Sequence, residues 1–226
     1  MLIAAGLVLA VAAWAFLFRL PRAGLWPRTW VTAPMLIAYA LVALAADDRL
    51  RSTIEPVTPV EVAVGIGVGG AWLVATQIGH RVLCRMFPAF LAQVNDLYRI
   101  RDDATPVWSM VGAVTLMGVA EELLFRGLVQ GGIGLLAAVA AYTLVQAVEG
   151  KWALGLAALL GGLVWGLTFA WRDGLVAPVV AHVLWTGTLT FLWPLRGCGA
   201  PDAAKECEAE ARGPAVPTSP TTQEIP

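Results

Sequence analysis

The sequence predicts an all-α fold, a polytopic bundle of about seven transmembrane helices. Of its 226 residues, 58% are hydrophobic and 14% are charged, whereas a soluble domain carries roughly 45–50% apolar and about 25% charged residues. The charged residues cluster between long runs that have almost none. A backbone inside a bilayer must satisfy its hydrogen bonds within each segment, which favours helices over other structures. Together these observations exclude an ordinary soluble enzyme and a disordered chain.

Seven apolar runs are long enough to be transmembrane helices, which need about 20 residues to cross the hydrocarbon of a bilayer. They lie at residues 1–19, 30–46, 60–83, 105–125, 128–148, 153–171 and 174–195. The first run lacks the basic start of a signal peptide and further apolar runs follow at once, so we expect it to remain as a helix. A shorter and more polar stretch at 87–98 is predicted to lie along the membrane surface.

Basic residues gather in the first and third connections between these runs. The first connection contains Arg19, Arg22 and Arg28, and the third, residues 81–101, contains four more arginines. Because cytoplasmic loops carry an excess of basic residues, both connections are predicted to be cytoplasmic. This places the N-terminus outside and, with seven spans, the C-terminus in the cytoplasm.

The chain divides into three predicted parts. Residues 1–103 hold the first transmembrane helices and a cytoplasmic linker, and residues 104–196 form a helical core that contains the candidate site. Residues 197–226 contain five prolines, five acidic residues and almost no large apolar groups. Such a composition buries too little apolar surface to fold, so this tail is predicted to be disordered.

The clearest chemical signal lies in the fourth apolar run. Between residues 104 and 148 the charged residues are Glu121, Glu122 and Arg126, and an ionisable group within a transmembrane segment marks a functional site by default. Glu122 and Arg126 are four residues apart, so they share a helix face and can pair. Glu121 is rotated by about 100° from Glu122. The spacing predicts one carboxylate held by arginine and one free for chemistry. Alternatively, both glutamates mark the membrane edge, with Arg126 reaching to the surface.

A second polar cluster occurs in the last apolar run. His182 lies in the middle of that run, and Thr186 follows one turn later on the same face. A lone histidine in an apolar helix is more often a packing residue than a catalyst. Beside a buried carboxylate, however, a neutral imidazole can orient water, accept a proton or bind a metal ion.

The run Glu121-Glu122-x-x-x-Arg126 resembles the first motif, EExxxR, of the CAAX-protease and bacteriocin-processing family. This family of intramembrane proteases includes the endopeptidases that trim prenylated CAAX proteins. Its helical core carries an FxxxH motif and an HxxxN or HxxxD motif after the first one. The resemblance covers roughly residues 104–196 and implies that this segment is the catalytic helical core.

The second and third motifs depart from the family pattern. The second matches residues 142–146, where Tyr142 replaces phenylalanine and Gln146 replaces histidine. In the third, His182 is present and Thr186 stands where the family has asparagine or aspartate. Glutamine donates and accepts hydrogen bonds but takes up no proton near neutral pH. It is also a poorer metal ligand than imidazole.

The resemblance implies an intramembrane endopeptidase of the glutamate or metal-assisted type. Glu121 would activate water, with Glu122 and Arg126 supporting the site. His182, together with Thr186, would stabilise the oxyanion of the tetrahedral intermediate. Gln146 belongs to the same candidate site by its place in the second motif.

The expected partners are membrane lipids and a peptide or lipidated protein substrate, and we expect the protein in the inner membrane of a bacterial cell. The formal net charge of −1 creates no global field that attracts nucleic acid, so no nucleic-acid partner is expected. The cofactor stays open between a divalent metal ion such as zinc and none.

Two alternative functions follow from the same residues. A catalytically weakened family member that acts as a binding scaffold is favoured by Gln146. A small transporter that uses Glu121 as a proton site has no specific support in the chain. Other intramembrane protease classes are disfavoured because the sequence has no HExxH motif, no GxGD motif and no serine in its late apolar runs.

Glycine-rich strings in the apolar runs predict close helix packing. GIGVGG at 65–70 fits a dinucleotide-binding pattern, but no strand precedes it, so small residues that let helices approach explain it better. The same reasoning applies to Gly162-x-x-x-Gly166. His80 is followed by Arg81 and is predicted to lie at the membrane interface, away from the site.

Overall fold

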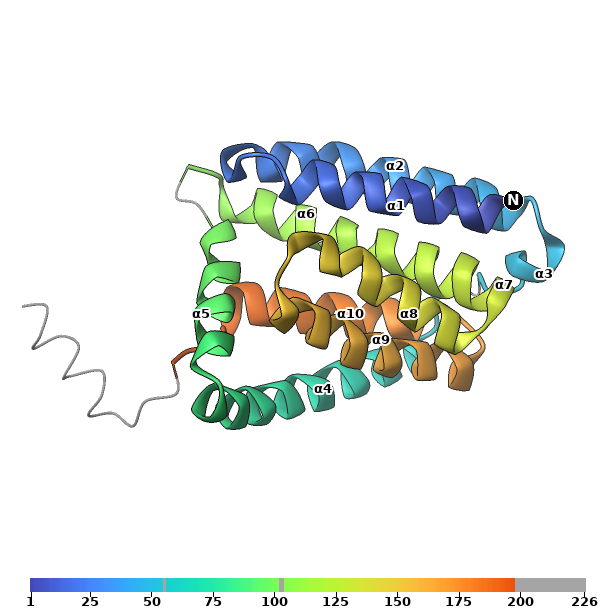
Figure 1. The fold of residues 1–226 in the computed structure, drawn as a ribbon. Helices are drawn as coiled ribbons and strands as arrows, with labels where there is room; N and C mark the ends of the chain where they lie inside the picture. The colour runs from blue at the N-terminus through green and yellow to red at the C-terminus, as the bar shows by residue number, and fades with distance from the viewer. Residues whose placement is uncertain (55, 102–103, 198–226) are drawn as a thin grey trace, which may run out of the picture. The chain divides into compact units, whose positions relative to one another are not determined.

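The computed structural model of the chain describes residues 1–54, 56–101 and 104–197. These residues are all-α, with no strand among them, which confirms the predicted fold class (Figure 1). Residues 1–196 form one compact unit. The tail predicted to be disordered, residues 197–226, lies outside the described part of the chain except for Gly197.

Seven apolar helices correspond in order to the seven predicted runs. They are α1 (Leu2–Phe18), α2 (Leu25–Ala45), α4 (Pro59–Met86), α6 (Val107–Glu122), α8 (Leu135–Gln146), α9 (Trp152–Arg172) and α10 (Val176–Gly187). The shorter elements are η1 (Arg22–Gly24), α3 (Asp48–Arg51), α5 (Pro88–Leu97), η2 (Tyr98–Ile100), η3 (Leu123–Gln130), α7 (Gly131–Ile133), η4 (Ala147–Glu149) and η5 (Thr188–Leu192). Of these, η3 and η5 are π-helical.

The helices differ in whether their length alone suits a membrane span. Among the described residues, four helices are long and apolar enough to cross a bilayer, at Arg22–Ala45, Pro59–Met86, Val107–Ile133 and Trp152–Arg172. The other three are shorter apolar helices of 10–17 residues. The protein is therefore an integral membrane protein by its helices, while the number of about seven spans stays a prediction.

The break between the fourth and fifth runs lies later than predicted. The sequence places it between 125 and 128, whereas the helix continues through η3 and α7 to Ile133 and turns at Gly134, whose φ is 93°. Glycine adopts this left-handed region without the steric cost of a Cβ atom. Within the intervening π-helix, Arg126 and Gln130 donate hydrogen bonds to backbone carbonyl oxygens of α9. Because these polar side chains are hydrogen-bonded inside the bundle, the chain can stay helical past them.

Helices α4 and α10 approach closely along glycines of the 65–70 run. A Cβ atom at Gly65 would lie 2.6 Å from Cβ of Val180, and one at Gly69 would lie 2.8 Å from the carbonyl oxygen of Ala181. Gly67 and Gly70 have nothing within 4 Å of such an atom. The prediction that this run serves helix packing is thus confirmed for the two glycines that face α10.

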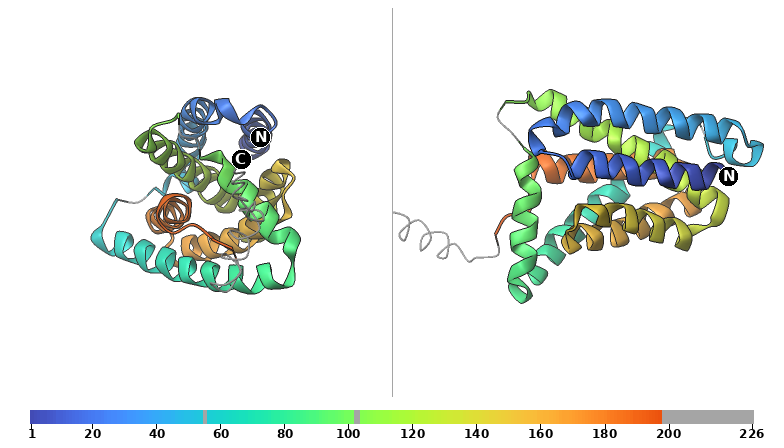
Figure 2. Two further views of the ribbon diagram at one scale, coloured as in Figure 1. Left: turned by 90° about the vertical axis from the view of Figure 1, so that its left-hand side faces the viewer. Right: turned by 45° about the horizontal axis from the view of Figure 1, so that its top comes forward.

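Helix α5 crosses the end of the bundle at an angle to the long helices (Figures 1 and 2). Asp96 near its C-terminal end accepts two hydrogen bonds from Arg22, at 2.6 and 3.1 Å, and forms an ion pair with Lys151 at 3.4 Å. The first and third connections therefore meet at the same end of the bundle, as predicted from their shared basic character. Which side of the membrane this end faces stays a prediction.

Candidate active site

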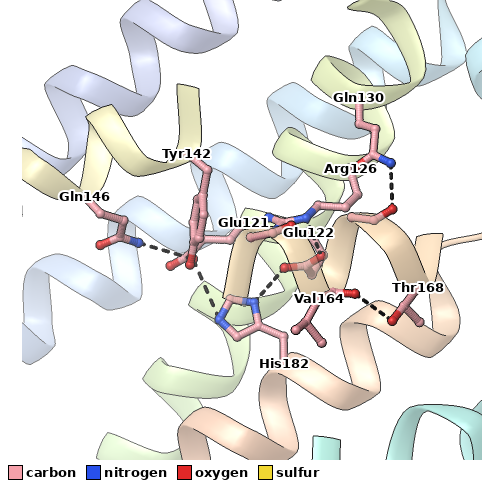
Figure 3. A network of polar contacts seen from close by, with 11 residues as sticks. Glu121, Glu122, Arg126, Gln130, Tyr142, Gln146, Val164, Thr168 and His182 are labelled. Carbon is pink, nitrogen blue, oxygen red and sulfur yellow. Dashed lines mark hydrogen bonds and ion pairs between the residues drawn. The ribbon is translucent and has the colours of Figure 1, made fainter. Parts of the chain in front are cut away.

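Five polar residues from four segments meet in the interior of the bundle (Figure 3). Glu121 and Glu122 end α6, Arg126 follows in η3, Gln146 ends α8, and His182 lies in α10. Each is at most 7% exposed. A polar group buried this deeply is costly unless it is paired, so the pairing of these side chains decides what the site can do.

Glu122 and Arg126 form the ion pair predicted from their spacing. Arg126 Nε lies 3.2 Å from Oε2 of Glu122, and both side chains are almost fully buried. The guanidinium also donates to the carbonyl oxygen of Gly162 at 3.3 Å and lies 4.7 Å above the centre of the Tyr142 ring. Gly162 lies in α9, so this bond connects the guanidinium to that helix. The arginine thus joins α6, α8 and α9 around one carboxylate.

Glu121 points away from the ion pair and toward α8. The Tyr142 hydroxyl donates to Oε2 of Glu121 at 2.6 Å, and Gln146 Nε2 donates to the same oxygen at 3.4 Å. His182 Nε2 lies 3.8 Å from that oxygen, too far for a hydrogen bond. The prediction that one carboxylate is held by arginine while the other faces elsewhere is confirmed.

The His182 ring is held by a hydrogen bond at one nitrogen and by stacking on one face. Its Nδ1 atom lies 2.7 Å from Oε1 of Glu122, so an Nδ1–H group donates to that carboxylate. Its ring stacks on Trp165 with centroids 5.5 Å apart and planes 16° apart. The remaining ring nitrogen, Nε2, faces Glu121. A histidine oriented by a carboxylate in this way can exchange a proton at its other nitrogen.

Two of the helices that carry the site, α6 and α10, continue into a π-helix. The first, η3, begins directly after Glu122, and the second, η5, begins two residues after Thr186. π-Helical turns are rare and occur frequently at functional sites. The wider turn of η3 still keeps Arg126 beside Glu122, with Arg126 Nε 3.2 Å from Oε2 of Glu122.

A cavity of about 370 Å³ opens beside the cluster. Its wall includes Glu121, Gln146, His182 and Thr186, and otherwise mainly apolar side chains of α1, α4, α5 and α9. The hydroxyl of Thr186 is buried and makes no hydrogen bond within the described residues. The site therefore borders an apolar space that can receive a hydrophobic peptide segment.

His80 lies elsewhere than predicted. The sequence predicts a place away from the site, but the side chain is 3% exposed and lines the same cavity. Its position at the membrane interface stays a prediction. Its Nε2 atom lies 2.8 Å from the carbonyl oxygen of Arg196. The neighbouring arginine points outward because successive helix residues are rotated by about 100°.

The donor set does not suit a catalytic zinc ion, which takes three protein ligands. At the cavity wall, Glu121 and His182 offer ligand atoms, whereas Gln146 turns its amide N–H toward Glu121. Within residues 1–54, 56–101 and 104–197, no three His, Cys, Asp or Glu side chains are arranged to hold a metal ion.

Three aromatic residues contact the site, and only Tyr142, the aromatic of the second motif, has a signal in the sequence. The Tyr142 hydroxyl, which replaces an apolar ring edge of the family motif, contacts Glu121 directly. Trp165 supports the ring of His182, and Trp14 of α1 donates to Gln146 Oε1 at 2.9 Å. Tryptophans are common throughout this chain, and nothing in their spacing distinguishes these two.

Comparison with known proteins finds a family match in the segment that contains the site. Residues 103–188 match a family model described as type II CAAX prenyl endopeptidase Rce1-like. The matched segment includes all of α6 to α10 and contains all six predicted site residues. The searches of curated proteins and of solved structures found no match.

Proposed function

We propose that this chain, whose residues 103–188 match the model of type II CAAX prenyl endopeptidase Rce1-like proteins, belongs to the CAAX-protease and bacteriocin-processing family and is an intramembrane endopeptidase in which Glu121 activates water. The observation that carries the proposal is the Glu121 carboxylate, which lies at the wall of an apolar cavity beside His182. We further propose the bacterial inner membrane as its location. Its substrate would be a C-terminal segment of a hydrophobic or lipidated chain.

In the proposed reaction, a water molecule binds between Glu121 and Nε2 of His182. Glu121 takes one proton from this water, and the oxygen forms a bond to the carbonyl carbon of the scissile peptide. The C–N bond then breaks as the proton passes to the leaving amine. Peptide and water are consumed, and a carboxylic acid and an amine are formed.

The charges around the site support proton transfer within the cluster. Two carboxylates and the guanidinium of Arg126 sum to one negative charge, which a single proton on Glu121 or His182 neutralises. Such neutrality lowers the cost of burying the cluster. When the proton is on His182, its Nε2–H can donate to the developing oxyanion, and the unpartnered hydroxyl of Thr186 is a second donor on the same helix face.

A second function is favoured by one observation. Gln146 stands where the family has histidine, and its amide N–H donates to Glu121 at 3.4 Å. An amide cannot carry the proton that an imidazole would carry. A catalytically weakened protein that binds a membrane peptide without cleaving it would have this arrangement. Under that alternative, Gln146→His gains cleavage that the wild type lacks.

The deciding experiment measures peptide cleavage by the purified protein in lipid. A library of C-terminal peptides, prenylated and plain, is incubated with wild type and with Glu121→Gln, and products are read by mass spectrometry. We expect cleavage by wild type and its loss in Glu121→Gln. Glu61→Gln is the control, because Glu61 is as buried as Glu121 but pairs with Arg172 and lies outside the cavity wall.

The outcomes separate the two functions. Cleavage that survives Glu121→Gln contradicts the proposed mechanism. A folded wild type that binds peptides and leaves them intact, while Gln146→His cleaves them, supports the scaffold. Thermal unfolding of each variant in the same lipid shows that the folds are comparable.

A further inference from the structure

We infer that Trp14 is a positioning residue of this active site, although it lies in α1, outside the segment that matches the family. The inference rests on the proposed function of Glu121 and deepens it. Trp14 holds the Gln146 carboxamide in one orientation, and that orientation makes Gln146 a hydrogen-bond donor to the water-activating carboxylate.

The contact joins residues that are 132 positions apart in the chain. Trp14 Nε1 donates to Oε1 of Gln146 at 2.9 Å, and Gln146 Nε2 donates to Oε2 of Glu121 at 3.4 Å. Trp14 is 2% exposed and Gln146 is 6% exposed. Both line the cavity next to Glu121. The first bond therefore lies in the interior, where no bulk water competes with it.

The chemistry of the indole decides which way the amide points. An indole nitrogen donates and never accepts, so the amide atom that faces Trp14 must be the oxygen. The amide nitrogen is then turned to the opposite side, toward Glu121. If the amide turned over, its N–H would face the indole N–H and its oxygen would face the carboxylate. Both contacts would be unfavourable, so one orientation is selected.

This orientation defines how Gln146 substitutes for the histidine of the family motif. It supplies an N–H to the same oxygen of Glu121 that accepts the Tyr142 hydroxyl. The Tyr142 hydroxyl and the Gln146 amide therefore fix the rotation of the Glu121 carboxylate, and the oxygen that they share lies 3.8 Å from Nε2 of His182. Gln146 thus orients the general base and does not share its proton.

Alongside this bond, Trp14 also packs against apolar neighbours, including the Phe18 ring, whose centre lies 6.4 Å from its own. Replacing Trp14 therefore alters packing as well as one hydrogen bond. A test must separate the two effects. Trp14→Phe keeps an aromatic ring and removes the N–H group, which makes it the variant of choice.

The kinetic test is a double-mutant cycle between Trp14→Phe and Gln146→Met. Methionine has a similar length to glutamine and lacks the amide. We expect Trp14→Phe to lower kcat about tenfold in the wild-type background, with KM within about twofold. In the Gln146→Met background, Trp14→Phe should have no further effect on kcat. A loss of the same size in both backgrounds means that Trp14 acts by packing alone and overturns the inference.

Trp30→Phe is the matched control. Trp30 donates its indole N–H to Oγ of Ser109 at 3.0 Å, between α2 and α6, and does not line the cavity. Removing that N–H should leave kcat unchanged. A fall in kcat equal to that of Trp14→Phe would show a general effect of losing an indole donor, and it would overturn the inference.

A second measurement is independent of cleavage. In protein labelled with ¹⁵N at glutamine side chains, the Gln146 amide resonances are assigned by their loss in Gln146→Met. We expect these amide protons to be protected from solvent exchange in wild type and to lose that protection in Trp14→Phe. Unchanged resonances and protection overturn the inference. If Trp14→Phe does not fold, the Trp14 indole N–H resonance is compared between wild type and Gln146→Met. The inference requires this resonance to shift, because Gln146→Met removes the acceptor of the indole N–H.

The two readouts distinguish failure of the inference from failure of the proposed function. If no variant cleaves any peptide but the Gln146 amide responds to Trp14→Phe, the positioning is real and the proposed proteolysis is wrong. If wild type cleaves and neither the cycle nor the spectra couple the two residues, the function holds and the inference is wrong.

Discussion

His182 Nδ1 lies 2.7 Å from Oε1 of Glu122, while Oε2 of the same carboxylate faces Arg126 Nε at 3.2 Å. One glutamate, 60 residues earlier in the chain than the histidine, therefore orients an imidazole and neutralises a buried arginine at the same time. Each of its two oxygens serves one of these purposes. Because both oxygens of Glu122 have partners inside the bundle, this side chain is fully buried, whereas Glu121 borders the cavity.

Glu122→Gln should damage stability and activity for separable reasons. The variant leaves Arg126 buried without a counter-charge, which costs about 3–5 kcal/mol of unfolding free energy. Losing the carboxylate behind a catalytic histidine lowers kcat by up to about 10⁴-fold. The double variant Glu122→Gln/Arg126→Met should recover most of the stability, read as thermal unfolding in lipid, but not the cleavage rate. Recovery of both would assign Glu122 a purely structural role.

Tyr142→Phe should slow cleavage and leave substrate binding nearly unchanged. The variant removes a hydroxyl that donates to Glu121 at 2.6 Å, and one such hydrogen bond contributes about 1 kcal/mol, or roughly fivefold in kcat. Tyr39→Phe is the control, since Tyr39 donates at the same distance to the carbonyl oxygen of Leu2, away from the site. Equal rates for wild type and Tyr142→Phe would remove the hydroxyl from the mechanism.

Gly65→Ala should destabilise the contact between α4 and α10. The added Cβ would lie 2.6 Å from Cβ of Val180, and such overpacking costs about 1–3 kcal/mol. Gly67→Ala, two residues away with nothing within 4 Å, should be neutral or stabilising by up to about 1 kcal/mol, because alanine favours helix more than glycine does. Thermal unfolding of both variants tests this, and similar melting temperatures would show that the two helices can separate at little cost.

Acid should weaken the attachment of α5 to the bundle end. Hydrogen bonds from Arg22, and then from Lys151, lower the pKa of Asp96 from 3.8 to about 2. Because the folded-state pKa is depressed, Asp96 stabilises the fold above pH 3.8 and this contribution is lost as the pH falls toward 2. Both partners are partly exposed, so the contribution is screened and amounts to less than about 1 kcal/mol.

Asp96→Asn tests this pH dependence. The difference in melting temperature between wild type and variant should be largest near pH 5 and shrink toward pH 2, and added salt should reduce it. Asp48→Asn, which removes an exposed carboxylate paired with Arg51, should show a smaller difference. A gap between wild type and Asp96→Asn that persists unchanged to pH 2 contradicts the assignment.

Much of the fold was predictable because membrane helices are read from local sequence. The apolar runs, the pairing of Glu122 with Arg126 and the meeting of the first and third connections all depend on short spacings or on loop composition. The break at Gly134 was predicted several residues too early. Arg126 lies at the predicted break, yet α9 accepts its hydrogen bond, as it accepts that of Gln130, and both side chains stay buried.

By itself, the sequence determined an all-helical membrane protein and the short list of polar residues on which a reaction could be built, since hydrogen bonding within a helix and the thickness of a bilayer are local constraints. Only the tertiary structure decided how those residues are partnered. The contacts of His182 with Glu122 and of Trp14 with Gln146 join helices 60 and 132 residues apart. Their distances depend on how side chains pack between helices, and no spacing along one helix encodes that packing.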